Sequence, residues 1–395
     1  MSRGSAGDPT RLAFFDAIGA GDRDTVRRMI EERPSRLGWR SARHFEATPI
    51  TVAVQEDHLA MVDLLLELGA DINAASGWWA GGWRPLHACF DPGRETMATA
   101  LIARGAEIDV HAAAGLGRID RLRALLDGDP QLVHARGGDG CSPLHFARTP
   151  EIAALLLERG ADIEMRDLDH ESTPLQWMCG KSRDMTRFLL EHGATPDAFA
   201  WAWLGDAVAL REFLDAHPDA VHHRVGQDPF VTRQSDAEHN YAYTFGSRAS
   251  PLHAAATGGS AACVRVLIER GIDPDVRGGT DDATPLHAAA WHDRADAAAA
   301  LVEHGASIDI LSGNMYNNTP LGWAIVGGSV QVVEVLLARG ARVTDDHRAN
   351  AASGAAGAFR QYVRTRPAEN WDRVRALIDA ARRGGSDGPD LRRRP

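Results

Sequence analysis

The sequence predicts an all-α protein: a solenoid of stacked helix-turn-helix units with extended fingers and a helical C-terminal cap. Three observations predict this class. A residue-proline start signal recurs along the chain, a glycine signal follows it about 20 residues later, and apolar residues between the two keep helical spacing. Repetition at a period of about 35 residues indicates a repeat architecture, in which each unit buries its apolar face against its neighbours.

The first helix of each unit is predicted by a proline that follows a capping residue. A Thr or Ser side chain accepts a hydrogen bond from the first turn of a helix, and proline lacks the N–H that has no partner there. A helix is therefore expected to begin at each proline. The start signals are Thr48-Pro49, Arg84-Pro85, Ser142-Pro143, Thr173-Pro174, Ser250-Pro251, Thr284-Pro285 and Thr319-Pro320.

The second helix of each unit is predicted by apolar residues at i, i+3 and i+4, as at Val264, Leu267 and Ile268. This spacing places the three side chains on one side of a helix. The glycine that follows suits the left-handed residue with which many helices end. These glycines are Gly69, Gly105, Gly160, Gly193, Gly271, Gly305 and Gly340.

Three degenerate units lack the start signal but keep the apolar spacing. Gly21, Gly117 and Gly205 each stand five residues before an apolar residue of such a unit. We interpret the degenerate units as the starts of three repeat blocks, which we place at residues 12–108, 109–197 and 198–345.

Two repeated segments show which repeat type this is: Ser250-Pro-Leu-His-Ala-Ala-Ala and Thr284-Pro-Leu-His-Ala-Ala-Ala. With Gly69-Ala-Asp-Ile-Asn73 they make the chain resemble the ankyrin-repeat family, of bacterial type, with about ten repeats. The resemblance implies a scaffold that binds a partner protein through its fingers and concave groove. It also implies that the Pro-Leu-His histidines make hydrogen bonds within the scaffold; these are His87, His145, His253 and His287.

The ends of the chain are expected to differ from the repeats. Residues 1–11 are predicted to be disordered. Residues 346–381 are predicted to form the helical cap, because Trp371, Val374, Leu377 and Ile378 share one helix face. Residues 382–395 contain five arginines and are expected to be a disordered basic tail, with a basic docking segment as the alternative.

Charge and composition limit the function classes. The formal net charge is −11, and residues 1–381 alone carry −14. Nucleic-acid binding needs a basic face, so we expect no nucleic-acid partner. Nowhere do 18 apolar residues run together, so no membrane span is expected. Four widely separated cysteines and the absence of a signal sequence favour reduced thiols and a cytoplasmic location.

One finger is unusually long and rich in tryptophan. The segment Ser76-Gly-Trp-Trp-Ala-Gly-Gly-Trp83 lies between Gly69 and the next helix start. Trp78, Trp79 and Trp83 have no predicted helix to bury them, and tryptophan is enriched at binding hot spots. We favour a recognition surface, with packing against the finger itself as the alternative.

An insertion near residues 222–249 is the second departure from the repeat. Long loops in compact folds are functional or disordered. The alternating residues Tyr241, Tyr243 and Phe245 favour an ordered segment, in which a hairpin strand is one conformation. Tyr241 and Tyr243 are candidate binding residues, and a purely structural insertion is the alternative.

Aromatic residues on first helices form the third departure. Trp203 and Trp291 share a register that ankyrin proteins generally leave exposed on the concave side, whereas Trp177 and Trp323 share one nearer the packed face. His292 after Trp291 and Tyr316 on the last finger are further candidate binding residues.

These aromatic residues could instead line a closed small-molecule pocket, which is the rival hypothesis. In a catalytic version of it, His170, Glu171 or His239 would act as general acid or base. The common phosphate-loop, zinc-protease and hydrolase motifs are missing, so no catalytic residue is predicted outright and no cofactor is expected. Cys141 and His145 are four residues apart but need not share a face, so no metal site is predicted.

The leading hypothesis is a non-enzymatic scaffold that binds a protein partner, and we expect a monomer. The identity of the partner is not encoded in any motif of the sequence.

Overall fold

The structure is a computed structural model that describes residues 8–233, 235–313, 318–363 and 365–384. Within these ranges the ordered elements are α- and 3-10 helices, with two isolated β-bridges and no strand. The predicted all-α solenoid is confirmed.

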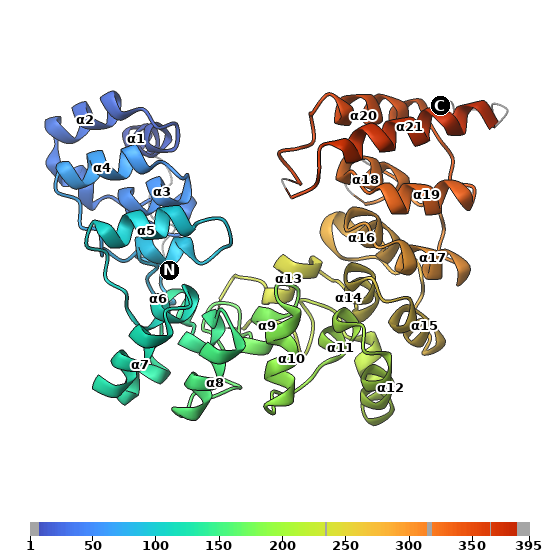
Figure 1. The fold of residues 1–395 in the computed structure, drawn as a ribbon, viewed down its shortest axis with the longest axis horizontal. Coiled ribbons are helices and arrows are strands. Elements are labelled where there is room, and N and C mark those ends of the chain that lie inside the picture. Colours follow the sequence, from blue (N-terminus) through green and yellow to red (C-terminus); the bar gives the residue numbers. More distant parts are fainter. Residues whose placement is uncertain (1–7, 234, 314–317, 364, 385–395) are drawn as a thin grey trace. The chain divides into compact units, whose positions relative to one another are not determined.

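The chain divides into two compact units, each built from consecutive helix pairs (Figure 1). The first unit consists of Met1–Leu175, Glu191–Ala194 and Arg233–Ala237, and the second contains the remaining residues. The pairs that begin in the first unit are α1 (Pro9–Gly19) with α2 (Arg23–Glu32), α3 (Pro49–Gln55) with α4 (Leu59–Glu67), η3 (Pro85–Cys89) with α5 (Glu95–Ala103), α6 (Val110–Gly115) with α7 (Ile119–Gly128), and η6 (Pro143–Phe146) with α8 (Pro150–Glu158). In two of these pairs the first helix is a short 3-10 helix.

The second unit contains most of the later pairs and one helix from the insertion; only Pro174 and Leu175 of the first later helix and Glu191 at the end of the second belong to the first unit. The pairs are α9 (Pro174–Met178) with α10 (Arg183–Glu191), α11 (Ala198–Leu204) with α12 (Ala207–Ala216), α14 (Pro251–Gly258) with α15 (Ala261–Glu269), α16 (Pro285–Trp291) with α17 (Ala295–Glu303), α18 (Pro320–Gly327) with α19 (Val330–Ala338), and α20 (Asp345–Ala355) with α21 (Glu369–Gly384). The inserted helix is α13 (Asn240–Phe245). Short 3-10 turns complete the fingers: η1 (Pro34–Gly38), η2 (Ala42–His44), η4 (Pro130–His134), η5 (Gly138–Gly140), η7 (Pro218–His222) and η8 (Thr280–Asp282).

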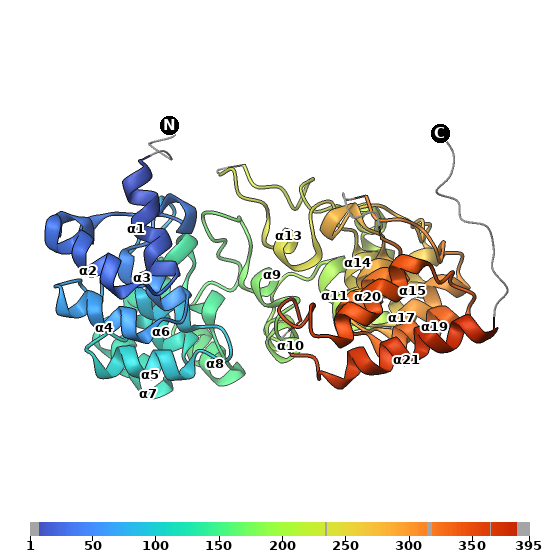
Figure 2. The ribbon, with the colours of Figure 1, turned by 90° about the horizontal axis from the view of Figure 1, so that it is seen from above.

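Within each unit, first helices contact first helices and second helices contact second helices. In the first unit α1, α3, η3, α6 and η6 follow one another in this way, and in the second unit α11, α14, α16, α18 and α20 do so. Helices α20 and α21 pack on α18 and α19 at the end of the second unit (Figure 1), and Figure 2 shows α21 beside α19. The apolar faces are thereby buried between neighbouring repeats, as a solenoid requires.

The helix starts and ends that were predicted from Pro and Gly are present. Thr48 and Thr319 cap α3 and α18 by accepting a hydrogen bond from the first turn. Every predicted C-terminal glycine has a positive φ between 90° and 96°. Only glycine adopts this conformation without strain, so these positions fix where each second helix ends.

The Pro-Leu-His histidines hold neighbouring repeats together, as the resemblance implies. The backbone N–H of Ser142 donates to Nδ1 of His145 at 3.1 Å, and Nε2 of His145 lies 3.1 Å from the carbonyl oxygen of Ser172 on the next finger. His253 and His287 repeat this geometry with Ala283 and Asn318. Since a carbonyl only accepts, Nε2 carries the proton and the neutral ring is the form that fits.

The degenerate units replace the Thr-Pro start by an aspartate that the sequence pattern did not show us. Asp109 caps α6 by accepting from the backbone N–H of Ala112, and Asp197 caps α11 by accepting from Ala200. Asp8 caps α1 in the same way. Helix α1 begins at Pro9, so residues 9–11 are helical and not disordered as predicted; residues 1–7 lie outside the described residues.

Arginine side chains form hydrogen bonds with the C-terminal ends of the first helices. Each donates to backbone carbonyls that have no partner within their own helix, and its positive charge is favourable at the negative end of the helix dipole. The arginines and their acceptors are Arg94 with Val54 and Gln55, Arg148 with Phe90, Arg183 with Leu204 and Gly258, Arg294 with Thr257, and Arg366 with Trp291.

The insertion contains a helix where a hairpin strand was one expectation, and that expectation was wrong. His239 caps α13 through Nδ1, which accepts from the backbone N–H of Tyr241. Tyr241 is fully buried, stacks on Phe199 at 5.0 Å, and donates to the carboxylate of Asp197 at 2.9 Å. The segment therefore closes over α11 as part of the core of the second unit.

The buried hydroxyl of Tyr241 is expected to matter for stability. In Tyr241→Phe the buried carboxylate of Asp197 loses a donor, which costs about 2 kcal/mol in the free energy of unfolding. The matched variant Tyr243→Phe changes a side chain that is 66% exposed. It should change the free energy of unfolding by less than about 0.5 kcal/mol. Urea unfolding followed by circular dichroism measures both, and equal effects would contradict a structural role for Tyr241.

The C-terminal end combines a buried helix with residues outside the described ranges. In α21, Trp371, Val374 and Ile378 are buried and Leu377 is half-buried. The helix extends to Gly384, so the predicted tail begins no earlier than residue 385, and residues 385–395 lie outside the described residues.

Candidate functional site

An exposed aromatic patch lies on the fingers of the first unit. We define the aromatic patch as Phe45, Trp78 and Trp79. Phe45 is 61% exposed and Trp79 is 55% exposed, while Trp78 is half-buried. The rings of Phe45 and Trp78 meet edge to face with centroids 5.3 Å apart. Aromatic surface of this kind favours contact with another molecule.

The turn that presents Phe45 is strained. Phe45 and Glu46 have φ values of 53° and 56°, in the left-handed region that bulky side chains avoid. Each such residue costs about 1–3 kcal/mol and persists only where the surroundings or a function enforce it. Sequence reasoning missed Phe45, although its place three residues before a helix-capping Thr marks the tip of a finger.

The other two predicted tryptophans are held by hydrogen bonds to later fingers. Nε1 of Trp78 donates to Oδ2 of Asp169 at 3.1 Å, and Nε1 of Trp83 donates to Oδ1 of Asp139 at 2.9 Å. The Trp83 ring lies so close over Gly138 that an added Cβ would come within 2.3 Å of it. Trp83 therefore stabilises the finger, and Trp79 exposes its ring to solvent. Trp78 is hydrogen-bonded to a later finger and remains partly exposed.

Beneath the aromatic patch lies an acidic cluster formed by Asp139, Asp167, Asp169 and His170. The backbone N–H groups of Leu168 and Asp169 donate to the carbonyl of Asp139. Burial raises the pKa of Asp139 to about 6. Burial alone would lower the pKa of His170, but the hydrogen bond to Asp167 and the charges of the nearby aspartates raise it above its ordinary value.

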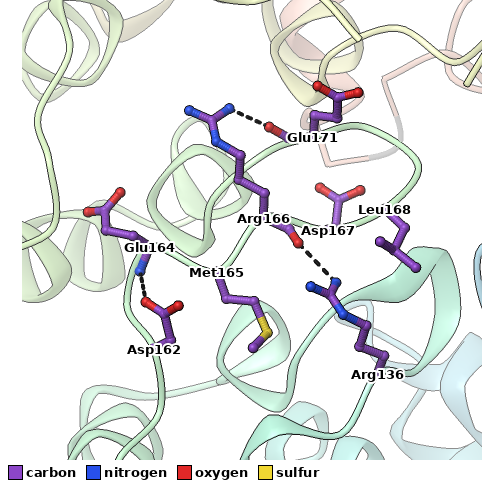
Figure 3. Close-up of a pocket in the computed structure, with 8 residues that line it drawn as sticks. All are labelled: Arg136, Asp162, Glu164, Met165, Arg166, Asp167, Leu168 and Glu171. Atoms are coloured by element: carbon purple, nitrogen blue, oxygen red, sulfur yellow. Dashed lines mark hydrogen bonds between the residues drawn. The ribbon is translucent and has the colours of Figure 1, made fainter. Parts of the chain in front are cut away.

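Beside this cluster the fingers leave a hollow of about 420 Å³ (Figure 3). Four carboxylates and two guanidiniums line it, together with Met165 and Leu168. The charged residues are Arg136, Asp162, Glu164, Arg166, Asp167 and Glu171. Sequence reasoning missed this hollow, because its residues come from two fingers.

The finger geometry is expected to depend on Gly81. A Cβ there would lie 1.9 Å from the carbonyl oxygen of Gly137, whereas one at Gly93, which also has a positive φ, would meet nothing within 4 Å. Gly81→Ala should therefore cost about 2 kcal/mol more in the free energy of unfolding than Gly93→Ala, because only the first forces two fingers apart. Urea unfolding of both variants measures the difference, and equal losses would show that the two fingers do not pack tightly.

The predicted concave aromatic residues of the second unit are mostly covered. Trp203 was expected to be exposed, but it is only 6% exposed, because the guanidinium of Arg183 lies 4.8 Å above its ring. Tyr241 is also buried, so neither ring is open to a partner. Trp291 is half-buried against Trp323, while His292 and Tyr243 are exposed. Tyr316 lies outside the described residues.

The catalytic candidates come from both units of the chain. His170 and Glu171 belong to the first unit and His239 to the second. His239 is 1% exposed, with Nδ1 accepting from Tyr241 and Nε2 lying 3.2 Å from Oε1 of Gln176. Oε1 of Glu171 accepts from the backbone N–H of Arg233. These side chains therefore take part in hydrogen bonds within the scaffold.

Cys141 and His145, whose spacing did not require them to share a face, do come together with Asp167. One potential ligand atom from each lies within 4.8 Å of the others. However, His145 uses Nδ1 and Nε2 in the repeat hydrogen bonds, and Asp167 accepts from the backbone N–H groups of His170 and Ser172. A metal ion would have to break these bonds, so the trio serves the scaffold.

The fold and the fingers together define a repeat scaffold that presents side chains at the tips of its turns. The ankyrin-repeat family pattern matches residues 14–111, 110–200 and 215–312 as sets of three repeats, and residues 316–348 as a single repeat. The chain therefore belongs to the ankyrin-repeat family.

Several known proteins share parts of this sequence. The ankyrin repeat protein nuc-2 of Neurospora crassa is 30% identical over 182 residues, which are 43% of this chain and 15% of that protein. Protein phosphatase 1 regulatory subunit 27 of Homo sapiens is 34% identical over 101 residues, which are 26% of this chain and 62% of that protein. The chain thus spans less than two thirds of the length of each relative.

Among solved structures, the human ASB11 ankyrin repeat domain is 26% identical, with a TM-score of 0.36, covering 60% of this chain and 99% of that chain. In the described part of this chain, no helix is both long and apolar enough to cross a lipid bilayer.

Proposed function

We propose that this ankyrin-repeat protein is a binding scaffold whose first unit holds a partner protein on the aromatic patch of Phe45, Trp78 and Trp79. The observation that carries the proposal is the exposure of the Phe45 and Trp79 rings, with the Phe45 ring packed on Trp78. The left-handed pair Phe45 and Glu46 closes the finger turn bridged by Ser41 and Ala47. The turn holds the Phe45 ring out in solvent, where an aromatic side chain can anchor a partner.

We also propose a cellular location, an oligomeric state, a repeat number and a second contact region. We place the protein in the cytoplasm of a bacterium, as a monomer with about ten repeats arranged in three blocks. In the second unit, Trp291 and His292 form a secondary contact region. The small-molecule or catalytic alternative has no observation in its favour.

Removal of the Trp79 ring should weaken partner binding while leaving the fold intact. Trp79→Ala is expected to cost about 2 kcal/mol of binding free energy, or roughly 30-fold in affinity, because an anchor ring is lost. Its melting temperature should stay within about 1 °C of the wild type, since the side chain is 55% exposed. A pull-down from lysate of the native host with wild-type and variant chains, read by mass spectrometry, identifies the partner, and titration of that partner gives the affinity.

Phe45→Gly provides a second variant of the same surface. It should also weaken binding, but it should raise the free energy of unfolding by about 1 kcal/mol, because glycine adopts the left-handed conformation freely. A partner that binds both variants as tightly as the wild type would show that the aromatic patch is not the interface.

A further inference from the structure

We propose that two arginines at the C-terminal end of α14, Arg183 and Arg294, bind the carboxylate of an aspartate or glutamate in a partner protein. Both arginines belong to the second unit. This arginine site therefore goes beyond the proposed function, which concerns the first unit, and does not depend on the aromatic patch.

The two guanidiniums converge on one helix end. Helix α14 lies between α11 and α16 (Figure 1). Arg183, the first residue of α10, donates through Nη1 to the carbonyl of Leu204 at 2.8 Å and through Nη2 to that of Gly258 at 2.7 Å. Arg294, which directly precedes α17, donates through Nε to the carbonyl of Thr257 at 2.9 Å. Because Thr257 and Gly258 are consecutive residues, the two positive charges lie close together.

The equivalent ends of α3 and α16 each combine one arginine with one carboxylate. Arg94, which caps α3, pairs with Asp57 at 3.7 Å, and Arg366, which caps α16, pairs with Asp293 at 3.2 Å. Both aspartates are left-handed, with φ of 61° and 55°, and each stands two residues before the second helix of its repeat. In the repeat of α14 this position is Gly259. The turn after α14 therefore brings two arginines together and supplies no carboxylate of its own.

The positive charge at this helix end exceeds what the surrounding structure offsets. A helix C-terminus is equivalent to roughly half a negative charge, so the ends of α11 and α14 offset about one of the two guanidinium charges. In the part of the chain that the structure describes, neither Arg183 nor Arg294 forms an ion pair, since their hydrogen bonds go to carbonyl oxygens. Burial, together with the positive charges of Arg294 and Arg187, lowers the pKa of Arg183. A carboxylate at this place would be attracted by the excess charge.

The chemistry of the ligand follows from the two equivalent helix ends. There the capping arginine pairs with an aspartate carboxylate, whose two oxygens match the planar guanidinium fork. Arg294 is exposed and uses only Nε in its bond to α14, so both of its Nη groups can donate to one carboxylate. Arg183 lies 4.8 Å above the ring of Trp203, which holds its guanidinium in place.

Two substitutions at position 259 separate charge from shape. Gly259→Asp supplies from within the chain the carboxylate that α3 and α16 have, and Gly259→Asn supplies the same shape without the charge. Asn and Asp are the residues that best tolerate the left-handed conformation after glycine. The atoms nearest to a Cβ at Gly259 belong to the flexible side chain of Arg294, with Cδ at 2.9 Å. The two variants should therefore have similar melting temperatures.

Random 12-residue peptides displayed on phage provide the probe. They are selected on the full wild-type chain, and the enriched peptides are titrated against each variant by fluorescence anisotropy. We expect a group of enriched peptides that contain Asp or Glu to bind Gly259→Asp at least about tenfold more weakly than the wild type, and Gly259→Asn within about threefold. Changing the acidic residue of such a peptide to its amide should weaken binding to the wild type equally, with no further loss on Gly259→Asp.

A second pair of variants controls for the capping role of the arginines. Arg294→Gln and Arg94→Gln both remove an arginine that caps a first helix, but only Arg294 belongs to the arginine site. The acidic peptides should bind Arg294→Gln at least about tenfold more weakly and Arg94→Gln within about twofold. The inference is overturned if no acidic peptide is enriched, if the two position-259 variants bind such peptides equally, or if Arg294→Gln binds them as tightly as the wild type.

Discussion

Acidification from pH 7 to pH 5 is expected to remove several kcal/mol from the stability of this protein. The cause is a group of three Pro-Leu-His histidines that link neighbouring repeats. Burial lowers the pKa of His145, His253 and His287 to about 4, from 6.5 in an unfolded chain. Each ring accepts at Nδ1 from a backbone N–H, so a proton placed on Nδ1 would break the bond that caps the helix.

The direction of the effect follows from the depressed pKa values. Between pH 6.5 and 4 the unfolded chain binds protons at these positions and the folded chain does not, so stability falls as the pH falls. Each histidine removes about 2 kcal/mol between pH 7 and 5, roughly 5 kcal/mol for the three. Asp139 acts in the opposite direction, because its raised pKa makes the folded state bind a proton more tightly as the pH falls; its effect is about 1 kcal/mol.

Urea unfolding followed by circular dichroism at pH 7 and pH 5 measures this loss. His253→Gln tests whether the histidines cause this loss. The variant should be less stable than the wild type at pH 7, but its free energy of unfolding should fall by about 2 kcal/mol less between pH 7 and pH 5. The matched variant His134→Gln changes an exposed ring and should leave the slope unchanged. Equal unfolding midpoints at the two pH values would show that the histidine links do not govern acid stability.

The helix starts and ends are the part of the fold that could be predicted from the sequence. Local signals such as the Pro and Gly positions fix the helix ends through hydrogen bonds and dihedral angles within a few residues, and the structure contains them as predicted. The Asp caps of the degenerate units also act locally. Asp109 and Asp197 could have been found, since each stands directly before an apolar helix.

The candidate site depends on contacts that no spacing reveals. Trp78 meets Asp169 across 91 residues, and Trp83 meets Asp139 across 56 residues. The sequence predicted an aromatic finger but could not separate the exposed Trp79 from the rings that support it. Trp203 was predicted in the right register for the concave side, yet an arginine from another repeat covers it. Tyr241 lies in a segment too short for its alternation to distinguish strand from helix.

Trp371→Ala is expected to be the most damaging single substitution at the C-terminal end. The ring is 1% exposed, and its Nε1 donates to the carbonyl of Val326 at 3.1 Å. It lies between two glycines: a Cβ on Gly328 would come within 2.9 Å of the ring, and one on Gly354 within 2.5 Å. The neighbouring repeat and the cap have thus left room for this side chain, and its removal leaves a cavity that costs about 3–5 kcal/mol.

Where Trp371→Ala destabilises the chain tests the solenoid architecture better than how much stability is lost. Repeats are stabilised mainly by their nearest neighbours, so the damage should be confined to the end of the second unit. In hydrogen exchange, the amides of α18 to α21 should lose protection in Trp371→Ala, while those of the first unit keep it. Tyr362→Ala changes a ring that is 63% exposed and serves as the control, with protection unchanged. If Trp371→Ala lowered protection equally in both units, the chain would unfold as a single cooperative block, and the capping role of α21 would extend to the whole protein.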